Sequence, residues 1–160
     1  MNTVKAYAPG DTERELTLTR VFDAPRALVF RAWTDPKLLA RWWGPQMFTN
    51  PVCEVDARPG GHLRIVMRGP DGSDYPMRGV FREVVAPEKL SFTNFAVDLE
   101  DRPVIEGFTT VLFAEEGGKT RLTIHTCGKA VQPVAVQYLQ GMEQGWTGSL
   151  EKLATLLPQL

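Results

Sequence analysis

The chain has little cysteine and little histidine, with two residues of each among its 160. Cys53 and Cys127 form no CxxC pair and are too few for a disulfide framework. We expect both thiols to stay free and to pack as small apolar side chains. His125 and Cys127 could supply two metal ligands, but a tetrahedral site needs a third or fourth at workable spacing. We therefore expect no metal and no cofactor.

The sequence also lacks an excess of charge of either sign. It has 18 Lys and Arg against 19 Asp and Glu, for a net charge of −1. Without a basic block, the electrostatic signature of a nucleic-acid-binding protein is missing. No apolar run reaches the roughly 18 residues of a transmembrane helix, and the N-terminus has no secretory signal. We expect a cytoplasmic monomer or homodimer with no nucleic-acid partner and no membrane insertion.

Sequence signatures of nucleophilic catalysis are absent as well. There is no GxSxG motif, and neither cysteine has a histidine nearby in a loop setting. The glycine-rich runs lie between predicted strands, where they indicate turns and not phosphate-binding loops. At 17.9 kDa the chain suits one domain. We expect a flexible extension over residues 1–14 and a single domain over residues 15–160.

What the sequence does contain is a succession of alternating apolar and polar residues, which is typical of strands. Short turns separate most of them, which favours an antiparallel meander. Around Glu83 the alternation mixes both phases and indicates a bulge. Arginines that alternate with the apolar positions predict a solvated outer face: Arg64, Arg78, Arg82 and Arg121. The predicted strands span residues 15–22, 52–57, 62–68, 75–85, 90–97, 104–114 and 120–126.

Helix signals occur at both ends of this succession. Pro25 and the pair Asp35-Pro36 predict two short helices, the second of which carries Trp42 and Trp43 and ends at Gly44-Pro45. Apolar residues at spacings of three and four then predict one long helix over residues 134–157, about 36 Å in length.

A twisted sheet of six or seven strands curls, and one helix cannot fill its concave face. The remaining space is either a solid core or a cavity, and we favour the cavity. One tryptophan of the tandem pair would then face the core while its neighbour closes the cavity mouth. The candidate lining residues are Trp42, Trp43, Leu63, Ile65, Met67, Phe81, Phe92, Val111, Phe113, Tyr138, Met142, Gly145, Trp146 and Ser149.

Four short motifs occur in this order: Trp42-Trp43-Gly44, Pro59-Gly60-Gly61, Pro70-Asp71-Gly72 and Gly145-Trp146. Together with the element order, they make residues 16–157 resemble the bacterial proteins related to the C-terminal domain of the activator of heat-shock protein 90 ATPase. That family belongs to the START-like, or SRPBCC, superfamily. The resemblance implies an α+β helix-grip fold. In that fold a curved antiparallel sheet of six to seven strands wraps around a long C-terminal helix, and two short helices follow the first strand.

The resemblance leaves three functions open, because this superfamily hosts several on one scaffold. The first is binding of a small hydrophobic or aromatic ligand between the sheet and the C-terminal helix, oriented by Tyr138 or Ser149. An alternative is a protein-interaction role like that of the chaperone-ATPase activator, with a chaperone as partner. A second alternative is an enzyme of the polyketide-cyclase or hydrolase kind, for which Glu83 or Tyr138 would have to serve. With no clear acid–base pair, we predict no catalytic residue and favour binding.

Overall fold

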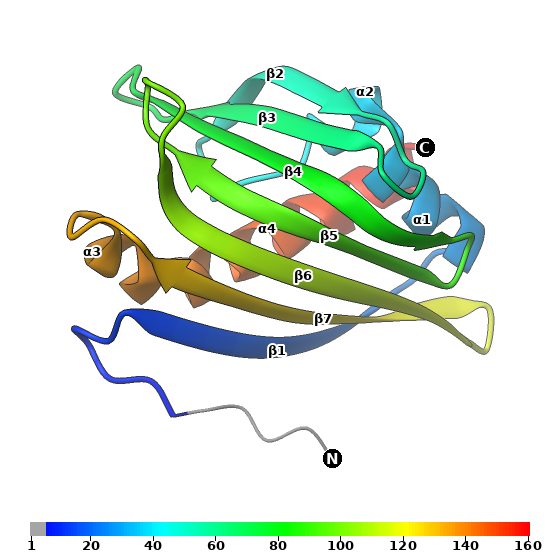
Figure 1. Cartoon of the computed structure of the whole chain (residues 1–160). Helices are drawn as coiled ribbons and strands as arrows, with labels where there is room; N and C mark the ends of the chain where they lie inside the picture. The colour runs from blue at the N-terminus through cyan, green and yellow to red at the C-terminus, as the bar shows by residue number, and fades with distance from the viewer. Residues whose placement is uncertain (1–5) are drawn as a thin grey trace.

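One curved antiparallel sheet organises the chain, in a computed structural model that describes residues 6–160 (Figure 1). Its seven strands follow the order β1-β7-β6-β5-β4-β3-β2, so that β1 and β2 form the two edges. The predicted meander and the helix-grip fold are therefore confirmed. The strands are β1 (Glu13–Phe22), β2 (Thr49–Val55), β3 (His62–Arg68), β4 (Asp74–Val85), β5 (Lys89–Val97), β6 (Pro103–Glu116) and β7 (Lys119–Ala130).

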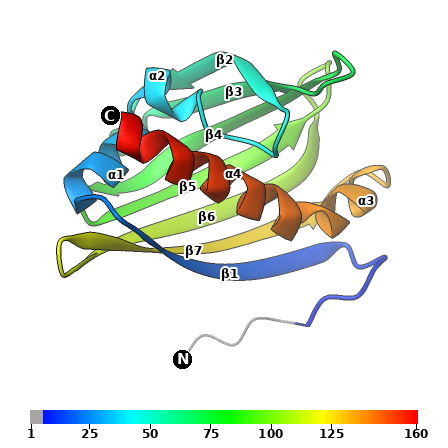
Figure 2. The ribbon, with the colours of Figure 1, turned by 180° about the vertical axis from the view of Figure 1, so that it is seen from behind.

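The helices cover one face of this sheet. Figure 2 shows the C-terminal helix crossing the concave face, with the two early helices at one end. They are α1 (Arg26–Thr34), α2 (Pro36–Leu39), α3 (Ala135–Gln140) and α4 (Met142–Leu156), followed by a 3-10 turn η1 (Leu157–Gln159). None of the helices in residues 6–160 has the length and hydropathy needed to cross a bilayer.

Strand alternation sorts the side chains of the sheet as the sequence predicts. On β7, Leu122, Ile124 and Thr126 are buried beneath the helices. His125 points the other way, and its Nδ1 lies 3.0 Å from the hydroxyl oxygen of Thr17. The predicted outer arginines are exposed, and three form surface ion pairs: Arg64–Glu54, Arg78–Asp101 and Arg121–Glu116.

The predicted irregularity on β4 is also confirmed. The pairing of β4 with β5 shifts register between Phe81, which faces Phe92, and Glu83, which faces Ser91. The extra residue lets both Phe81 and Val84 pack towards the core while Glu83 stays exposed.

Two predicted helix boundaries are wrong. Helix α2 ends at Leu39, so that Trp42 and Trp43 lie in the turn that follows, with both of their N–H groups donating to the Leu39 carbonyl. The long C-terminal helix is broken at Gly141, whose N–H donates to the carbonyl of Tyr138 three residues earlier. Glycine gives the helix little resistance to such a break, because it carries the largest backbone entropy.

The first strand begins at Glu13, inside the predicted extension of residues 1–14, of which residues 1–5 lie outside the described chain. Arg14 pairs with Gly128 of β7. Its guanidinium donates to the carbonyl of Leu139 at 2.7 Å and lies 4.2 Å from the centre of the Tyr7 ring. A cation at this position satisfies a free carbonyl at the C-terminal end of α3. Arg14 therefore joins the first strand to α3.

Candidate functional site

One half of the concave face is a solid aromatic core. Trp33 of α1 lies at its centre, with ring centroids 4.7 Å from Trp42, 6.2 Å from Phe113 and 6.2 Å from a stacked Trp146. Such edge-to-face and offset contacts add to the free energy of burial. The half of the groove covered by α1 and α2 therefore holds side chains in place of a cavity.

Seven of the fourteen residues predicted to line a cavity lie in this solid half. All are nearly inaccessible to solvent because they pack against one another and against α1 and α4. They are Trp42, Leu63, Ile65, Phe81, Phe92, Val111 and Phe113.

The tandem tryptophans have different environments. Trp42 is 0% exposed, and its indole Nε1 donates to the carbonyl of Ala32 at 2.9 Å. Trp43 is 9% exposed and meets Trp146 edge-on at 5.3 Å between ring centroids. Trp43 and Trp146 mark the boundary of the solid core, because their other sides line a cavity.

Beyond this boundary the groove is hollow. An inner chamber of about 180 Å³ lies between strands β3–β7 and helices α3 and α4. Three of the five methionines of the chain, Met67, Met77 and Met142, contribute to its wall, together with Trp43 and Trp146. Methionine walls adapt to the shape of a guest because the side chain is unbranched and flexible.

An outer chamber of about 530 Å³ borders the inner one. The two share wall residues on the four neighbouring strands β3–β6, among them Met67, Ala96 and Ile105. The outer chamber adds Phe48 from the loop before β2 and Tyr138 from α3. Its volume is in the range of small-molecule sites.

The loop of residues 43–48 forms one wall of this cavity and is fixed by polar contacts. The Lys152 ammonium group donates to four backbone carbonyls in this loop, at 3.2–3.3 Å. Burial lowers the pKa of Lys152, while the four carbonyl oxygens favour its charged form. Asn50 also donates to the Trp43 carbonyl, at 2.9 Å. Gly44 is required at φ +91°, since an added Cβ would lie 2.8 Å from the Met67 sulfur.

Two predicted lining residues on α4 face other groups. A Cβ added at Gly145 would meet only Pro45, at 3.8 Å, so the glycine lies against the loop of residues 43–48 and not against the sheet. Ser149 is buried, and its hydroxyl donates to the Gly145 carbonyl at 3.0 Å within the helix. Neither residue lines either chamber, whereas the predicted Met67, Tyr138, Met142, Trp43 and Trp146 do.

Sequence reasoning missed the polar group on the cavity floor. Asn94 of β5 lines the inner chamber, and its Oδ1 accepts a hydrogen bond at 2.8 Å from the hydroxyl of Thr109 on β6. That hydroxyl lies 2.7 Å from the hydroxyl of Thr126 on β7. The only signal in the sequence is that Asn94 shares the alternation phase of Phe92 and Ala96, which predicts a polar side chain on the apolar face.

Carboxylates occur at the rim of the outer chamber. Backbone hydrogen bonding from Arg102 holds the pKa of Asp98 below its usual range, and a hydrogen bond from Arg68 does the same for Asp74. Both carboxylates therefore remain ionised at neutral pH and fix neighbouring turns.

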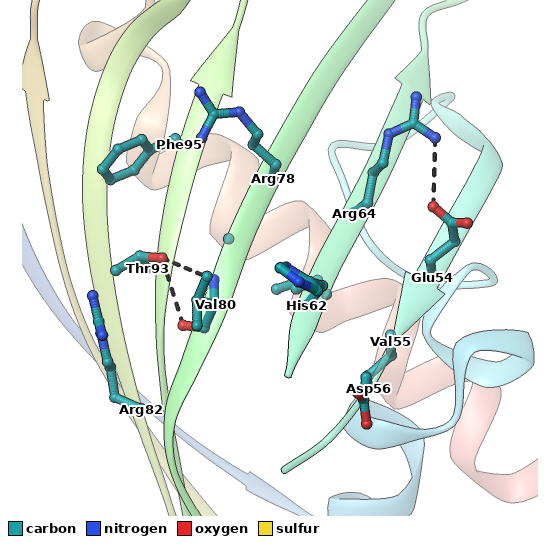
Figure 3. Close-up of a pocket in the computed structure, with 12 residues that line it drawn as sticks. Glu54, Val55, Asp56, His62, Arg64, Arg78, Val80, Arg82, Thr93 and Phe95 are labelled. Carbon is teal, nitrogen blue, oxygen red and sulfur yellow. Dashed lines mark hydrogen bonds and ion pairs between the residues drawn. The ribbon is translucent and has the colours of Figure 1, made fainter. Parts of the chain in front are cut away.

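A second hollow lies on the opposite, convex face, where Figure 3 shows Arg64, Arg78, His62 and Phe95 on strands β3–β5. It measures about 750 Å³, and exposed charged side chains make up much of its lining. Two of its three arginines, Arg64 and Arg78, already pair with Glu54 and Asp101. We therefore take the apolar cavity on the concave face as the candidate site. Nowhere in residues 6–160 do three metal-binding side chains gather.

The architecture and the cavity can be compared with known proteins. The sequence model of the family described as "Activator of Hsp90 ATPase homolog 1-like protein" matches residues 23–158. The chain belongs to this family. No curated protein sequence matches it.

Solved structures of bacterial proteins share the fold of this AHSA1-like chain. A protein from Nitrosomonas europaea is 30% identical, with a TM-score of 0.74 over 91% of this chain and 94% of its own. One from Mycobacterium smegmatis is 28% identical, with a TM-score of 0.76 over 99% and 98%. An AHSA1 protein from Silicibacter pomeroyi is also 28% identical, with a TM-score of 0.76 over 91% and 98%.

Proposed function

We propose that this AHSA1-like protein binds a small hydrophobic or aromatic molecule in the inner and outer chambers. The observation that carries the proposal is the wall that the two chambers share. Five residues line both apolar spaces, from which we infer one site that reaches from the rim at Asp98 to the tryptophans at the core. A site of this kind gains affinity by removing apolar ligand surface from water.

The charges around the site support binding over acid–base chemistry. The rim carboxylates of Asp74 and Asp98 have lowered pKa values, which is the opposite of the shift that a general acid needs at neutral pH. Glu83, a candidate for catalysis on sequence grounds, is exposed on the convex side and pairs with Lys89 at 2.9 Å. We further propose a cytoplasmic location, where Cys53 and Cys127, both free, stay reduced.

The proposal can be tested with 2-ethylnaphthalene, an apolar probe of suitable size. Trp43 and Trp146 line the inner chamber, so binding should change the intrinsic fluorescence of the protein. Ala96 lies in the wall of both chambers, and Ala96→Leu should weaken binding by tenfold or more because the added atoms occupy the ligand space. Ala114→Leu, on the exposed face of β6, is the matched control and should bind normally.

Failure of the wild type to bind the probe would count against a ligand site, as would equal binding by the Ala96→Leu variant. If the probe binds as expected, native mass spectrometry of the protein purified from its own host would identify the natural ligand from the mass that it adds.

A further inference from the structure

A chain of three side chains crosses the cavity floor, and its hydrogen bonds run in one direction. Thr109 Oγ1 donates its only proton to Asn94 Oδ1 at 2.8 Å. The contact of 2.7 Å between Thr109 and Thr126 must then use the proton of Thr126, because a hydroxyl carries one donor. Thr109 and Thr126 are both 0% exposed, so water does not compete for these bonds. In this arrangement Oδ1 of Asn94 is the accepting atom.

The orientation of the amide places its nitrogen on the side of β6. Asn94 pairs with Gly107, and a Cβ added to Gly107 would lie 2.9 Å from Asn94 Nδ2. The amide nitrogen thus takes the space that a side chain at this position would fill. No acceptor within residues 6–160 receives a hydrogen bond from Nδ2. Asn94 also lines the inner chamber, where its two N–H donors are available to a guest.

The rest of the inner chamber restricts what such a guest can be. Its wall contains no lysine, arginine or histidine, and its side chains are mainly methionine, aromatic and aliphatic. A carboxylate or phosphate buried there would lack a counter-charge and would lose free energy on leaving water. An uncharged oxygen acceptor avoids this cost, while a pure hydrocarbon would leave the Asn94 donors unpaired.

We propose that the ligand carries a neutral carbonyl oxygen and that Asn94 Nδ2 donates to it, with Thr109 and Thr126 as positioning residues. This inference rests on the proposed function, since it names the ligand chemistry of the same cavity. The carbonyl end lies in the inner chamber beside Asn94, and the apolar remainder extends into the outer chamber. Asn94 therefore sets both the ligand class and its orientation.

A matched pair of probes tests the proposal: 2-acetylnaphthalene, which has a ketone, and 2-ethylnaphthalene, which has none. The measured quantity is the ratio of their two dissociation constants. Asn94→Leu keeps the side-chain size and removes the donor, so it should reduce the relative affinity for the ketone by about tenfold, the effect of one hydrogen bond. The two probes differ in hydration free energy, but this difference is the same for wild type and variant and cancels when their ratios are compared. Binding of 2-ethylnaphthalene should stay within about twofold of wild type.

Two further variants separate donation from packing. Met77→Leu changes the wall of the same chamber without removing a donor, so both probes should shift together. Asn94→Leu combined with Thr109→Val removes the hydroxyl whose proton loses its acceptor in Asn94→Leu, and it should show the same loss of ketone preference.

Infrared spectroscopy of wild type with bound 2-acetylnaphthalene gives a readout independent of any variant. The carbonyl band should lie at lower frequency than in cyclohexane, because donation from Nδ2 weakens the C=O bond. A band at the cyclohexane position, or a probe ratio unchanged by Asn94→Leu, would overturn the role of Asn94 and leave the ligand site intact. Failure of both probes to bind wild type would overturn the ligand site itself, and this inference with it.

Discussion

The ammonium group of Lys152 on α4 donates to the backbone carbonyl of Trp43 at 3.2 Å. The same group reaches the carbonyls of Gly44, Pro45 and Phe48, each at 3.3 Å. An ammonium has three protons to share among these four acceptors. One side chain thus fixes the loop that begins at the solid core with Trp43 and reaches the outer chamber with Phe48.

Removing this ammonium group should destabilise the protein. Lys152→Met keeps the apolar stem but leaves partly buried carbonyls without a donor, and we expect a loss of about 1–3 kcal/mol in the free energy of unfolding. Urea denaturation measures the change. Lys129→Met, at an exposed position on β7, is the control and should change stability by less than about 0.5 kcal/mol. Equal effects of the two substitutions would contradict a specific role for Lys152.

The two tandem tryptophans should respond differently to truncation. Trp42→Ala removes a fully buried ring and leaves the Ala32 carbonyl unpaired, so we expect a loss of about 3–5 kcal/mol. Trp43→Ala should cost less, because one side of its ring already faces the inner chamber. It should also enlarge that chamber and change the affinity for 2-ethylnaphthalene. Chemical denaturation and probe titration of both variants measure these effects. Equal, small losses in the free energy of unfolding would argue against different environments for the two tryptophans.

Two glycines on α4 form a further pair for comparison. A methyl group at Gly145 would have its nearest contact at 3.8 Å, to Pro45, whereas one at Gly148 would lie 3.3 Å from the backbone nitrogen of Gln46. Gly145→Ala should therefore raise the free energy of unfolding, by up to about 1 kcal/mol, through helix propensity. Gly148→Ala should show less gain or a loss, since the loop backbone must move. Thermal melts of both variants show which is the more stable. A Gly148→Ala variant more stable than Gly145→Ala would contradict this packing.

The thiol of Cys53 should react slowly. Burial raises its pKa to about 11, and the charge of Glu54 acts in the same direction. At pH 8 only about one such thiol in a thousand is ionised, against about one in four for an unperturbed cysteine. Because the thiolate is the nucleophile, alkylation by iodoacetamide at pH 8 should lag far behind that of a free cysteine in solution, and should accelerate with pH up to about 11. Peptide mass mapping over time gives the rate, and rapid labelling of the folded protein at pH 8 would refute the shift.

The distance between the two cysteines is a case that sequence reasoning could predict. A meander places its early and late strands apart, and β2 and β7 are indeed separated by five strand spacings, or about 24 Å. Both cysteines are free, as expected. The outer arginines and the bulge before Glu83 were predictable for the same reason, because alternation along one strand is local information.

The division of the concave face was not predictable in this way. Whether Phe92 or Met67 borders a cavity depends on which side chains arrive from other strands and helices, and no single segment contains that information. Gly145 is an example, because helical spacing indicates its face but not that the loop around Pro45 covers it. Asn94 is another, because its partner Thr109 is fixed by cross-strand register, which the pattern of either strand alone leaves open.

The solid aromatic half of the groove has a consequence for how this scaffold can change. Trp33 and its neighbours hold the sheet against α1 and α4 without any guest, so the empty protein already has a core to fold around. Residues such as Ile105 and Ala96 on the hollow side lie outside that core and can be exchanged at smaller risk to folding. We expect inherited variation to concentrate on the chamber walls, where substitutions can change the bound ligand while the aromatic core stays the same.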